Sequence, residues 1–360
     1  MVTVQAPERP SIGFLLEQTL GHVSHGGTLR RSLADVEEAQ VAFRELAFDP
    51  ARRLDHVPPL SNWTVRAGRA ARRAVQDLQR EGPLDALFVH THVPATLLGS
   101  VMDRLPTVVS LDATSQQLDT LAGSYNHDVH PGAIEAIMHR IHASTFHRAA
   151  ALITWSAWAA DSLTSDYGVD GDRIEVIPPG VVMSQWRRPA HHPFDPDVVR
   201  ILFVGGDFER KGGPLLVDAV ARLSNDPEIQ REGSRVELHL VTSAKVEAGP
   251  NVHVHRGLAP NDPELIELFH RADIFALPTQ GDCSPVVLAE AAAAGLPAVA
   301  TDVGAIRESV VDGVTGHLVG RSVDSLADAL RRLVVDPDHR RKLGCAATEH
   351  AERTMDAERN

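Results

Sequence analysis

The 360-residue chain has little cysteine, few aromatic residues and no excess of positive charge. Its two cysteines, Cys283 and Cys345, are too few for a disulfide framework, so a reducing, cytoplasmic environment is expected. Aromatic residues make up only 4% of the chain, so the core must be built from Val, Leu, Ile and Ala, as in sheets covered by helices. A net charge of -13 argues against a nucleic-acid-binding protein.

Long apolar runs are also missing. No segment reaches the ~18 apolar residues that span a bilayer, and Met1–Pro10 lacks the apolar centre of a signal peptide. A helix is expected over Asn62–Glu81, and we interpret its basic residues as a solvated face, with peripheral contact to the inner face of a membrane as the alternative. These residues are Arg66, Arg69, Arg72, Arg73 and Arg80.

Short apolar runs that alternate with helical patterns fill most of the chain, which is typical of doubly wound parallel sheets. The alternation occurs twice, on either side of a stretch at 187–198 that is rich in proline, histidine and charge and indicates a linker. The sequence therefore predicts two Rossmann-like α/β domains, over residues 1–186 and 199–345, followed by a C-terminal helix at 346–360.

Most elements follow from this alternation. The expected strands are Ser11–Glu17, Leu84–His90, Pro106–Leu111, Ala151–Thr154, Ile174–Ile177, Arg200–Val204, Arg235–Val241, Val252–Val254, Ile274–Pro278, Pro297–Thr301 and His317–Val319. Two of the expected helices are Ala95–Leu105 and Ala305–Val311, the second with Gly313 as its cap.

Glycine-rich turns follow three expected strands of the second domain. In the first turn, Gly205 and Gly206 precede Arg210 and Lys211, and a helix starts near Pro214. Glycines let backbone N–H groups approach an anion, a helix N-terminus adds partial positive charge, and the two cations add formal charge. The GxxxxGK[ST] order of a P-loop is absent. Alone, this turn is equally typical of a plain turn with solvated charges.

The second turn contains Asp282, with Ser284 and Pro285 expected as the N-cap and first residue of a helix. Glu290 lies inside that apolar helix, where an unpaired carboxylate is costly; a glutamate that faces solvent or pairs with an arginine is the alternative. The third turn is Asp302–Ala305. Because the carboxyl ends of parallel strands share one edge of a sheet, we expect the three turns to form one ligand site.

The chain resembles the family 4 retaining glycosyltransferases of the GT-B fold, most strongly in the strings FVGGDFERKGG and ALPTQGDCSPVVLAEAAAAGLPAVATDVGAIRESVVDGVTGHLV. The resemblance implies two Rossmann-like domains facing a central cleft. It also implies transfer of a sugar from a nucleotide diphosphate sugar, with a UDP-sugar favoured and a GDP-sugar next. The acceptor would be a hydroxyl group of a small molecule, glycan or lipid.

The resemblance implies roles for matching positions. Arg210 and Lys211 would neutralise the donor diphosphate. Asp282 would contact sugar hydroxyls, and Glu290 would hold the ribose. Together with Glu290, the residues implied in donor binding are Gly21, Gly205, Gly206, Cys283, Ser284, Pro285 and Val286.

In relatives the first domain binds the acceptor. The candidates here are His22, His90, His92, Asp112, Tyr125 and His127, with ordinary polar loop residues as the alternative. His90 and His92 are expected on one face of a strand, as are His253 and His255. Neither pair has a clear third ligand in the sequence, so ordinary roles are favoured, and no metal or other cofactor is expected.

Two positions depart from the family pattern. Asp282 stands where the family usually has Glu, and Asp112 stands where many relatives have His. These departures keep two alternatives open: a nucleotide-sugar-binding protein without transfer activity, and a GT-B-like epimerase. A phosphorylase is disfavoured because no lysine motif for covalent pyridoxal phosphate is recognisable.

Overall fold

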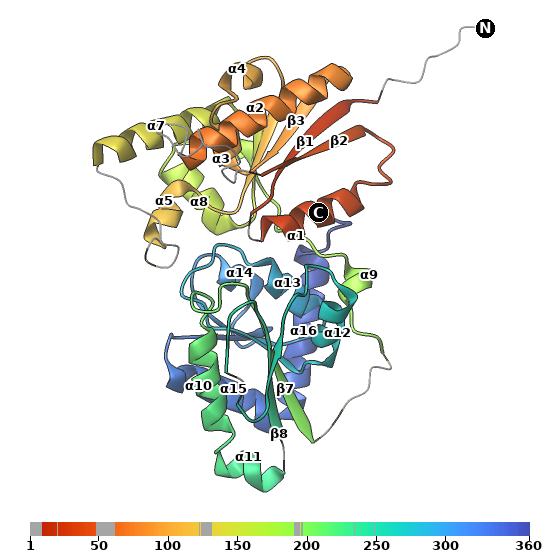
Figure 1. Ribbon diagram of the computed structural model, residues 1–360, viewed down its shortest axis with the longest axis vertical. Coiled ribbons are helices and arrows are strands. Elements are labelled where there is room, and N and C mark those ends of the chain that lie inside the picture. The colour runs from red at the N-terminus through yellow and green to blue at the C-terminus, as the bar shows by residue number, and fades with distance from the viewer. Residues whose placement is uncertain are drawn as a thin grey trace, which may run out of the picture. The chain divides into compact units, whose positions relative to one another are not determined.

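The structure is a computed structural model that describes residues 9–19, 21–47, 62–121, 123, 132–190, 195, 197–233, 235–247 and 249–360. The described residues form two compact units, each built around a parallel six-stranded sheet with flanking helices (Figure 1). The first unit holds the described residues up to Gln117 and those from 132 to Ile177; the second holds 118–121, 123 and Pro178–Asn360. The predicted pair of doubly wound α/β domains is confirmed.

The sheet of the first unit has the strand order β2-β1-β3-β4-β5-β6. Its strands are β1 (Ser11–Glu17), β2 (Gln40–Leu46), β3 (Ala86–His90), β4 (Thr107–Leu111), β5 (Ala151–Thr154) and β6 (Ile174–Val176). The helices between them are α1 (His22–Ser32), α2 (Trp63–Glu81), α3 (His92–Ala95), α4 (Gly99–Met102), α5 (Ser115–Thr120), α7 (Gly132–Arg148) and α8 (Ala157–Ser165). A short 3-10 helix, Gly171–Arg173, precedes β6.

The sheet of the second unit has the order β12-β11-β10-β7-β8-β9. Its strands are β7 (Val198–Val204), β8 (Arg235–Val241), β9 (Val252–His255), β10 (Ile274–Leu277), β11 (Ala298–Thr301) and β12 (Gly316–Val319). Its helices are α9 (Met183–Trp186), α10 (Gly213–Leu223), α11 (Pro227–Glu232), α12 (Pro263–Arg271), α13 (Val286–Ala293), α14 (Ile306–Ser309), α15 (Val323–Val335) and α16 (Pro337–Thr354).

The strand order of each sheet reverses next to its first strand. In the first unit β1 lies between β2 and β3, and in the second β7 lies between β8 and β10. The chain therefore leaves the carboxyl ends of β1 and β3, and of β7 and β10, in opposite directions. Open α/β sheets bind ligands at such switch points, because the diverging loops leave a crevice there.

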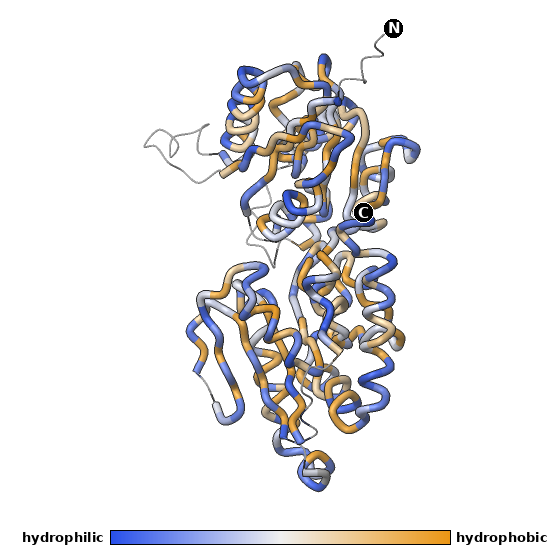
Figure 2. The backbone as a smooth tube through the Cα atoms, turned by 90° about the vertical axis from the view of Figure 1, so that its right-hand side faces the viewer, coloured by the Kyte–Doolittle hydropathy of each residue, from blue (hydrophilic) through white to orange (hydrophobic). Residues whose placement is uncertain are grey.

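The burial of strand residues explains why apolar runs in the sequence predict the strands. All four residues of β10 are buried, as expected for a parallel strand with both faces covered. In α2 the small and aliphatic side chains from Ala67 to Leu78 face the core, while Arg69, Arg72 and Arg73 are exposed. Hydrophobic segments are interspersed with hydrophilic ones along the backbone of both units (Figure 2). No described helix is both long and apolar enough to cross a bilayer.

The structure differs from the local expectations at one strand, which was not expected, and at two helices. The edge strand β2 was missed, because only Leu46 of its seven residues is buried and its apolar signal is weak. The expected helix Ala95–Leu105 is two short helices, α3 and α4; the Thr96 hydroxyl donates to the Val93 carbonyl at 2.8 Å where α3 ends.

The expected helix Ala305–Val311 is also shorter, because α14 ends at Ser309 and Val310 is extended. Gly313 does not cap this helix. It lies in the turn before β12, where its N–H donates to the Gly316 carbonyl at 2.8 Å.

The change from one unit to the other falls between Ile177 and Pro178, before the predicted linker at 187–198. Residues 178–186 belong to the second unit because α9 packs on it: the Trp186 ring lies 5.1 Å from that of Phe269, and the Trp186 carbonyl lies 3.1 Å from His270 Nε2. At the other end, residues 346–354 continue α16, and Val181 exchanges backbone hydrogen bonds with Met355 and Ala357.

Candidate functional site

Three strand-to-helix loops meet at the carboxyl edge of the second sheet. The loop after β10 joins the loop after β7, because the Gln280 N–H donates to the Arg210 carbonyl at 2.7 Å. The loop after β11 joins it in turn, because the Ala305 N–H donates to the Cys283 carbonyl at 2.8 Å. The expected convergence of the three glycine-rich turns is therefore present in the structure.

Two cations and one carboxylate form the centre of this site. Lys211 Nζ lies 2.7 Å from Asp282 Oδ2, and Arg210 Nη1 lies 3.7 Å from the same oxygen. Arg210 is held from both sides: Nη1 donates to the Gly281 carbonyl at 2.6 Å, and Nε donates to Asp207 Oδ2 at 3.1 Å. The three central side chains are at most 15% exposed, so water screens their charges poorly.

Two glycines allow the loops to approach this closely. Gly212 has φ +80°, and a Cβ there would lie 2.0 Å from the Pro278 carbonyl oxygen. Gly304 has φ +57°, and a Cβ there would lie 2.1 Å from the Asp282 carbonyl oxygen. At Gly206, in contrast, a Cβ would meet no atom of the described part of the chain within 4 Å. A backbone that faces open space can be approached by a ligand, as the donor-binding role expected for Gly206 requires.

Helix α13 places Glu290 behind the second loop. Pro285 is its N-cap and Val286 its first residue, so the expectation of Ser284 as N-cap is wrong by one position. Among the described residues, none caps this end through its side chain. The Glu290 side chain is buried, as Asp282 and Cys283 are, and each of the three has at least one polar or electrostatic interaction.

The loop after β7 also borders a pocket of about 520 Å³. It is lined by Gly206, Asp207, Phe208 and Glu209, by residues of α10, and by the segment Ala244–Glu247 that follows β8. The backbone of the cation-bearing loop is thus accessible from this side of the unit.

The first unit has its own polar cluster at the carboxyl ends of β1 and β3. His90 Nε2 lies 2.9 Å from His22 Nδ1, and the Thr91 hydroxyl donates to Glu17 Oε2 at 2.6 Å. The ring of Trp155 stacks on His90, with centroids 5.1 Å apart and planes within 8°. Gly21 is the N-cap of α1, and a Cβ there would meet none of the described residues within 4 Å.

Asp112 follows β4 in the same unit. Burial raises the pKa of its carboxyl group, while the nearby His22 acts in the opposite direction. Burial also lowers the pKa of His25 to about 3, with the neighbouring His22 adding to the effect. Both groups therefore tend toward their neutral forms.

His90 and His92 do not share one face, contrary to expectation. The strand ends at His90, and His92 is already the first residue of α3, so the two-residue alternation stops between them. His92 lies in a separate buried cluster, where its Nε2 is 3.2 Å from the Ser115 hydroxyl, which in turn is 2.6 Å from His142 Nδ1. Tyr125 and His127 lie outside the described residues.

Sequence reasoning missed several residues of the first-unit cluster. His25, Trp155 and Thr91 were not singled out, and no spacing rule links Trp155 to His90 along the chain. It also did not connect His253 with Glu237 and His239 of the strand RVELHLV, although one carboxylate or imidazole atom of each of the three lies within 4.8 Å of the others. The expectation of ordinary, non-metal roles for the pair His253 and His255 stays a prediction.

Comparison with known proteins agrees with this geometry. Residues 198–336 match the family described as glycosyl transferases group 1, and residues 28–185 match glycosyltransferase family 4. A D-inositol 3-phosphate glycosyltransferase of Nocardia farcinica is 33% identical over 224 residues, which are 56% of this chain and 48% of that protein. The chain thus spans about half the length of such relatives.

A glycogen synthase of Mycobacterium tuberculosis is 30% identical over 297 residues, which cover 76% of this chain and 67% of that protein. Among solved structures, Anabaena HepE in complex with UDP and glucose has a TM-score of 0.68 and 16% identity, covering 97% of this chain and 96% of that one. At this identity the likeness shows the fold. The sequence matches and the two parallel sheets together show that this chain belongs to glycosyltransferase family 4, with the GT-B fold.

Proposed function

We propose that this chain transfers a sugar from a nucleotide diphosphate sugar to a hydroxyl group, with retention of configuration at the sugar. The observation that carries the proposal is the placement of Arg210 and Lys211, mostly buried, beside Asp282 where three loops meet. Family membership supports the reaction class. The arrangement supports the donor class, because a poorly screened pair of cations suits a diphosphate.

The chemistry follows from the charges that develop as the donor breaks. Cleavage of the bond between sugar and diphosphate leaves negative charge on the leaving oxygen and positive charge on the sugar ring. Lys211 and Arg210 stabilise the negative charge on the leaving oxygen, because fixed cations in a poorly solvated site need little reorganisation. The Asp282 carboxylate holds both cations in place and orients sugar hydroxyls, and Glu290 binds the ribose.

In this proposal the acceptor binds to the first unit, at the carboxyl ends of β1 and β3. Its hydroxyl oxygen bonds to the sugar on the face that the diphosphate leaves, and the hydroxyl proton passes to the departing diphosphate oxygen. Orientation therefore matters more than a separate strong base. The His22–His90 pair and the stacked Trp155 offer a polar edge beside an aromatic ring, a combination suited to a polyol. The relatives' names point to different acceptors, an inositol phosphate and a glucan, so we propose no acceptor beyond this class.

UDP-sugars are the favoured donors and GDP-sugars the next, and the presence of UDP and glucose on HepE supports this order. The transfer uses no metal ion in this proposal, because Lys211 and Arg210 supply the charge that a divalent ion would supply. It takes place in the cytoplasm, and the exposed arginines of α2 allow peripheral contact with the inner face of a membrane.

The alternative is a nucleotide-sugar-binding protein without transfer, motivated by the Asp282 and Asp112 departures. A thermal-shift screen of UDP, GDP, ADP, dTDP and their glucose conjugates, with and without EDTA, identifies the donor. Release of the nucleotide diphosphate is then measured across a panel of inositol phosphates, glucans and other polyols. Release that depends on an acceptor supports transfer, and NMR of the product's anomeric proton tests retention. Tight donor binding without release for any acceptor favours the alternative.

A further inference from the structure

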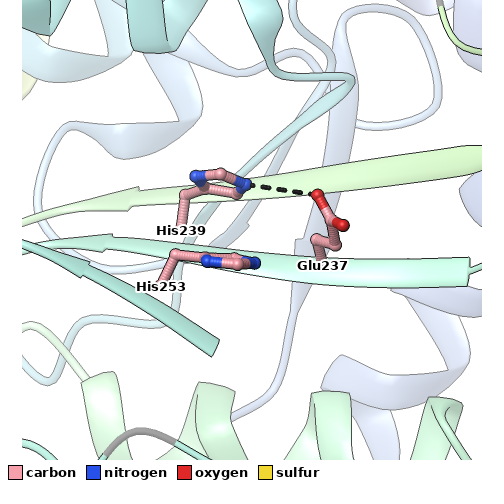
Figure 3. Close-up of side chains that lie close together, drawn as sticks. All are labelled: Glu237, His239 and His253. Carbon is pink, nitrogen blue, oxygen red and sulfur yellow. Dashed lines mark ion pairs between the residues drawn. The ribbon is translucent and has the colours of Figure 1, made fainter. Parts of the chain in front are cut away.

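Four side chains that the donor site does not use lie together at the outer edge of the second sheet. Glu237 and His239 are on β8, and His253 and His255 are on β9. The parallel register pairs His239 with His253, and residues two apart on a strand share one face. Figure 3 shows Glu237, His239 and His253 grouped on neighbouring strands.

The distances bring ligand atoms of three residues within reach of one ion. One ligand atom each from Glu237, His239 and His253 lies within 4.8 Å of the other two. The rings of His239 and His253 stack with centroids 4.8 Å apart. Metal–ligand bonds of about 2.1 Å at a tetrahedral angle place ligand atoms roughly 3.4 Å apart. The exposed His253 side chain has room to close the remaining gap.

The contacts of His239 indicate which of its nitrogens is available. Its Nδ1 lies 3.1 Å from His255 Nε2. Its buried Nε2 has no hydrogen-bond partner among the described residues and lies 3.7 Å from Glu237 Oε2, beyond hydrogen-bonding distance. If Nδ1 donates to His255, the lone pair of Nε2 faces the carboxylate oxygen. A cation between these two acceptors would satisfy both, and histidines that bind metals commonly have their other nitrogen hydrogen-bonded in this way.

We propose that Glu237, His239 and His253 bind a divalent transition-metal ion of the zinc class, with His255 orienting His239 and water in the fourth position. Imidazole nitrogens combined with one carboxylate suit zinc, cobalt or nickel better than magnesium or calcium, which require oxygen ligands. The site is separate from the cation cluster of the donor loops. Its role is to fix the edge strand β9 to β8.

Two arginines limit the affinity of this site. Arg235 lies 3.0 Å from Glu237 Oε1, and Arg200 Nε lies 3.4 Å from Glu237 Oε2. Arg200 also reaches Asp195 Oδ2 at 3.3 Å, so it has a second carboxylate when a metal occupies Oε2. Glu237 can therefore bind the metal through Oε2 while Oε1 keeps its ion pair with Arg235.

The test is zinc binding by the full chain, stripped with a chelator and measured by calorimetry and melting temperature. The wild type should bind one zinc more tightly than His253→Gln by at least about tenfold. Its melting temperature should rise by roughly 5 °C at about 100 times the Kd. His339→Gln, which changes a histidine pair elsewhere in the same unit, is the matched control and should bind as the wild type does.

Two further readouts separate a metal site from general histidine binding. Bound cobalt should show the intense visible bands of tetrahedral coordination, and His253→Cys, which keeps a ligand, should retain them. Zinc should slow hydrogen exchange of the amides of β9 in the wild type. The proposal would be overturned if the wild type and His253→Gln bound zinc with equal affinity. It would also be overturned if His339→Gln lost as much zinc affinity as His253→Gln. None of these readouts depends on a nucleotide, so the outcome is independent of the proposed transferase activity.

Discussion

Lys211 Nζ lies 2.7 Å from Asp282 Oδ2, although the two residues follow different strands, β7 and β10. The contact joins the two sides of a topological switch point. Because Asp282 also approaches Arg210 at 3.7 Å, one carboxylate orients both cations that we assign to the diphosphate.

Lys211→Met should lower kcat by about 10²–10³-fold, because it removes the fixed charge to which we assign stabilisation of the leaving group. The measurement is release of nucleotide diphosphate at saturating donor and acceptor. Lys342→Met on the exposed face of α16 is the control and should leave kcat unchanged. If Lys211→Met retained wild-type kcat, Lys211 would have no role in leaving-group stabilisation.

Glu290→Gln should weaken nucleotide binding by about 10–100-fold, since hydrogen bonds to a charged group contribute roughly 1.5–3 kcal/mol. The Kd for the nucleotide that the thermal-shift screen selects, measured by calorimetry, tests this. Glu264→Gln, at an exposed position of α12, should bind that nucleotide normally. An unchanged Kd for Glu290→Gln would assign the ribose contact to another residue.

Gly212→Ala should destabilise the second unit more than Gly233→Ala does. Both glycines have positive φ, so both changes introduce backbone strain of about 1–2 kcal/mol. Only at Gly212 would the new Cβ meet a carbonyl oxygen, that of Pro278 at 2.0 Å, and so force the loops after β7 and β10 apart. Urea unfolding should show the difference, and nucleotide affinity should fall only in Gly212→Ala. If Gly212→Ala and Gly233→Ala lowered the free energy of unfolding equally, the loops after β7 and β10 would accommodate a side chain between them.

The first unit should lose stability as the pH falls from about 6.5 toward 3. Burial lowers the pKa of His25 to about 3 and that of His142 to about 4, and it also lowers those of His90 and His92. Above pH 6.5 these histidines are neutral in both states. Below it the unfolded chain binds protons that the folded unit does not, so the free energy of unfolding decreases.

Within this window, each such histidine lowers the free energy of unfolding by about 1.4 kcal/mol for each unit by which the pH falls. The free energy of unfolding, measured in urea at pH 7.5 and at pH 5, should therefore fall by about 2 kcal/mol less in His25→Gln than in the wild type. A drop of the same size in both proteins would show that His25 is charged in the folded state.

Much of the fold, and much of the loops after β7, β10 and β11, follows from local sequence. Apolar runs such as Ile274–Leu277 predict strands because both of their faces are buried. Glycine turns predict loops because close approach excludes a side chain, as at Gly212 and Gly304. The edge strand β2 lacks such a signal, since most of it is only partly buried, and α9 joins the second unit through the contacts of Trp186.

The sequence by itself determined the two α/β units, the strand–glycine–helix turns and the residue types in the loops that we assign to the donor, because periodicity and glycine placement are local properties. Only the tertiary structure decided which loops meet. The order of β7 beside β10 brings Lys211 to Asp282, and that of β1 beside β3 brings His22 to His90. The register of β8 against β9 likewise places His239 next to His253. Strand order and register are set by packing and hydrogen bonding between distant segments, which no local pattern encodes.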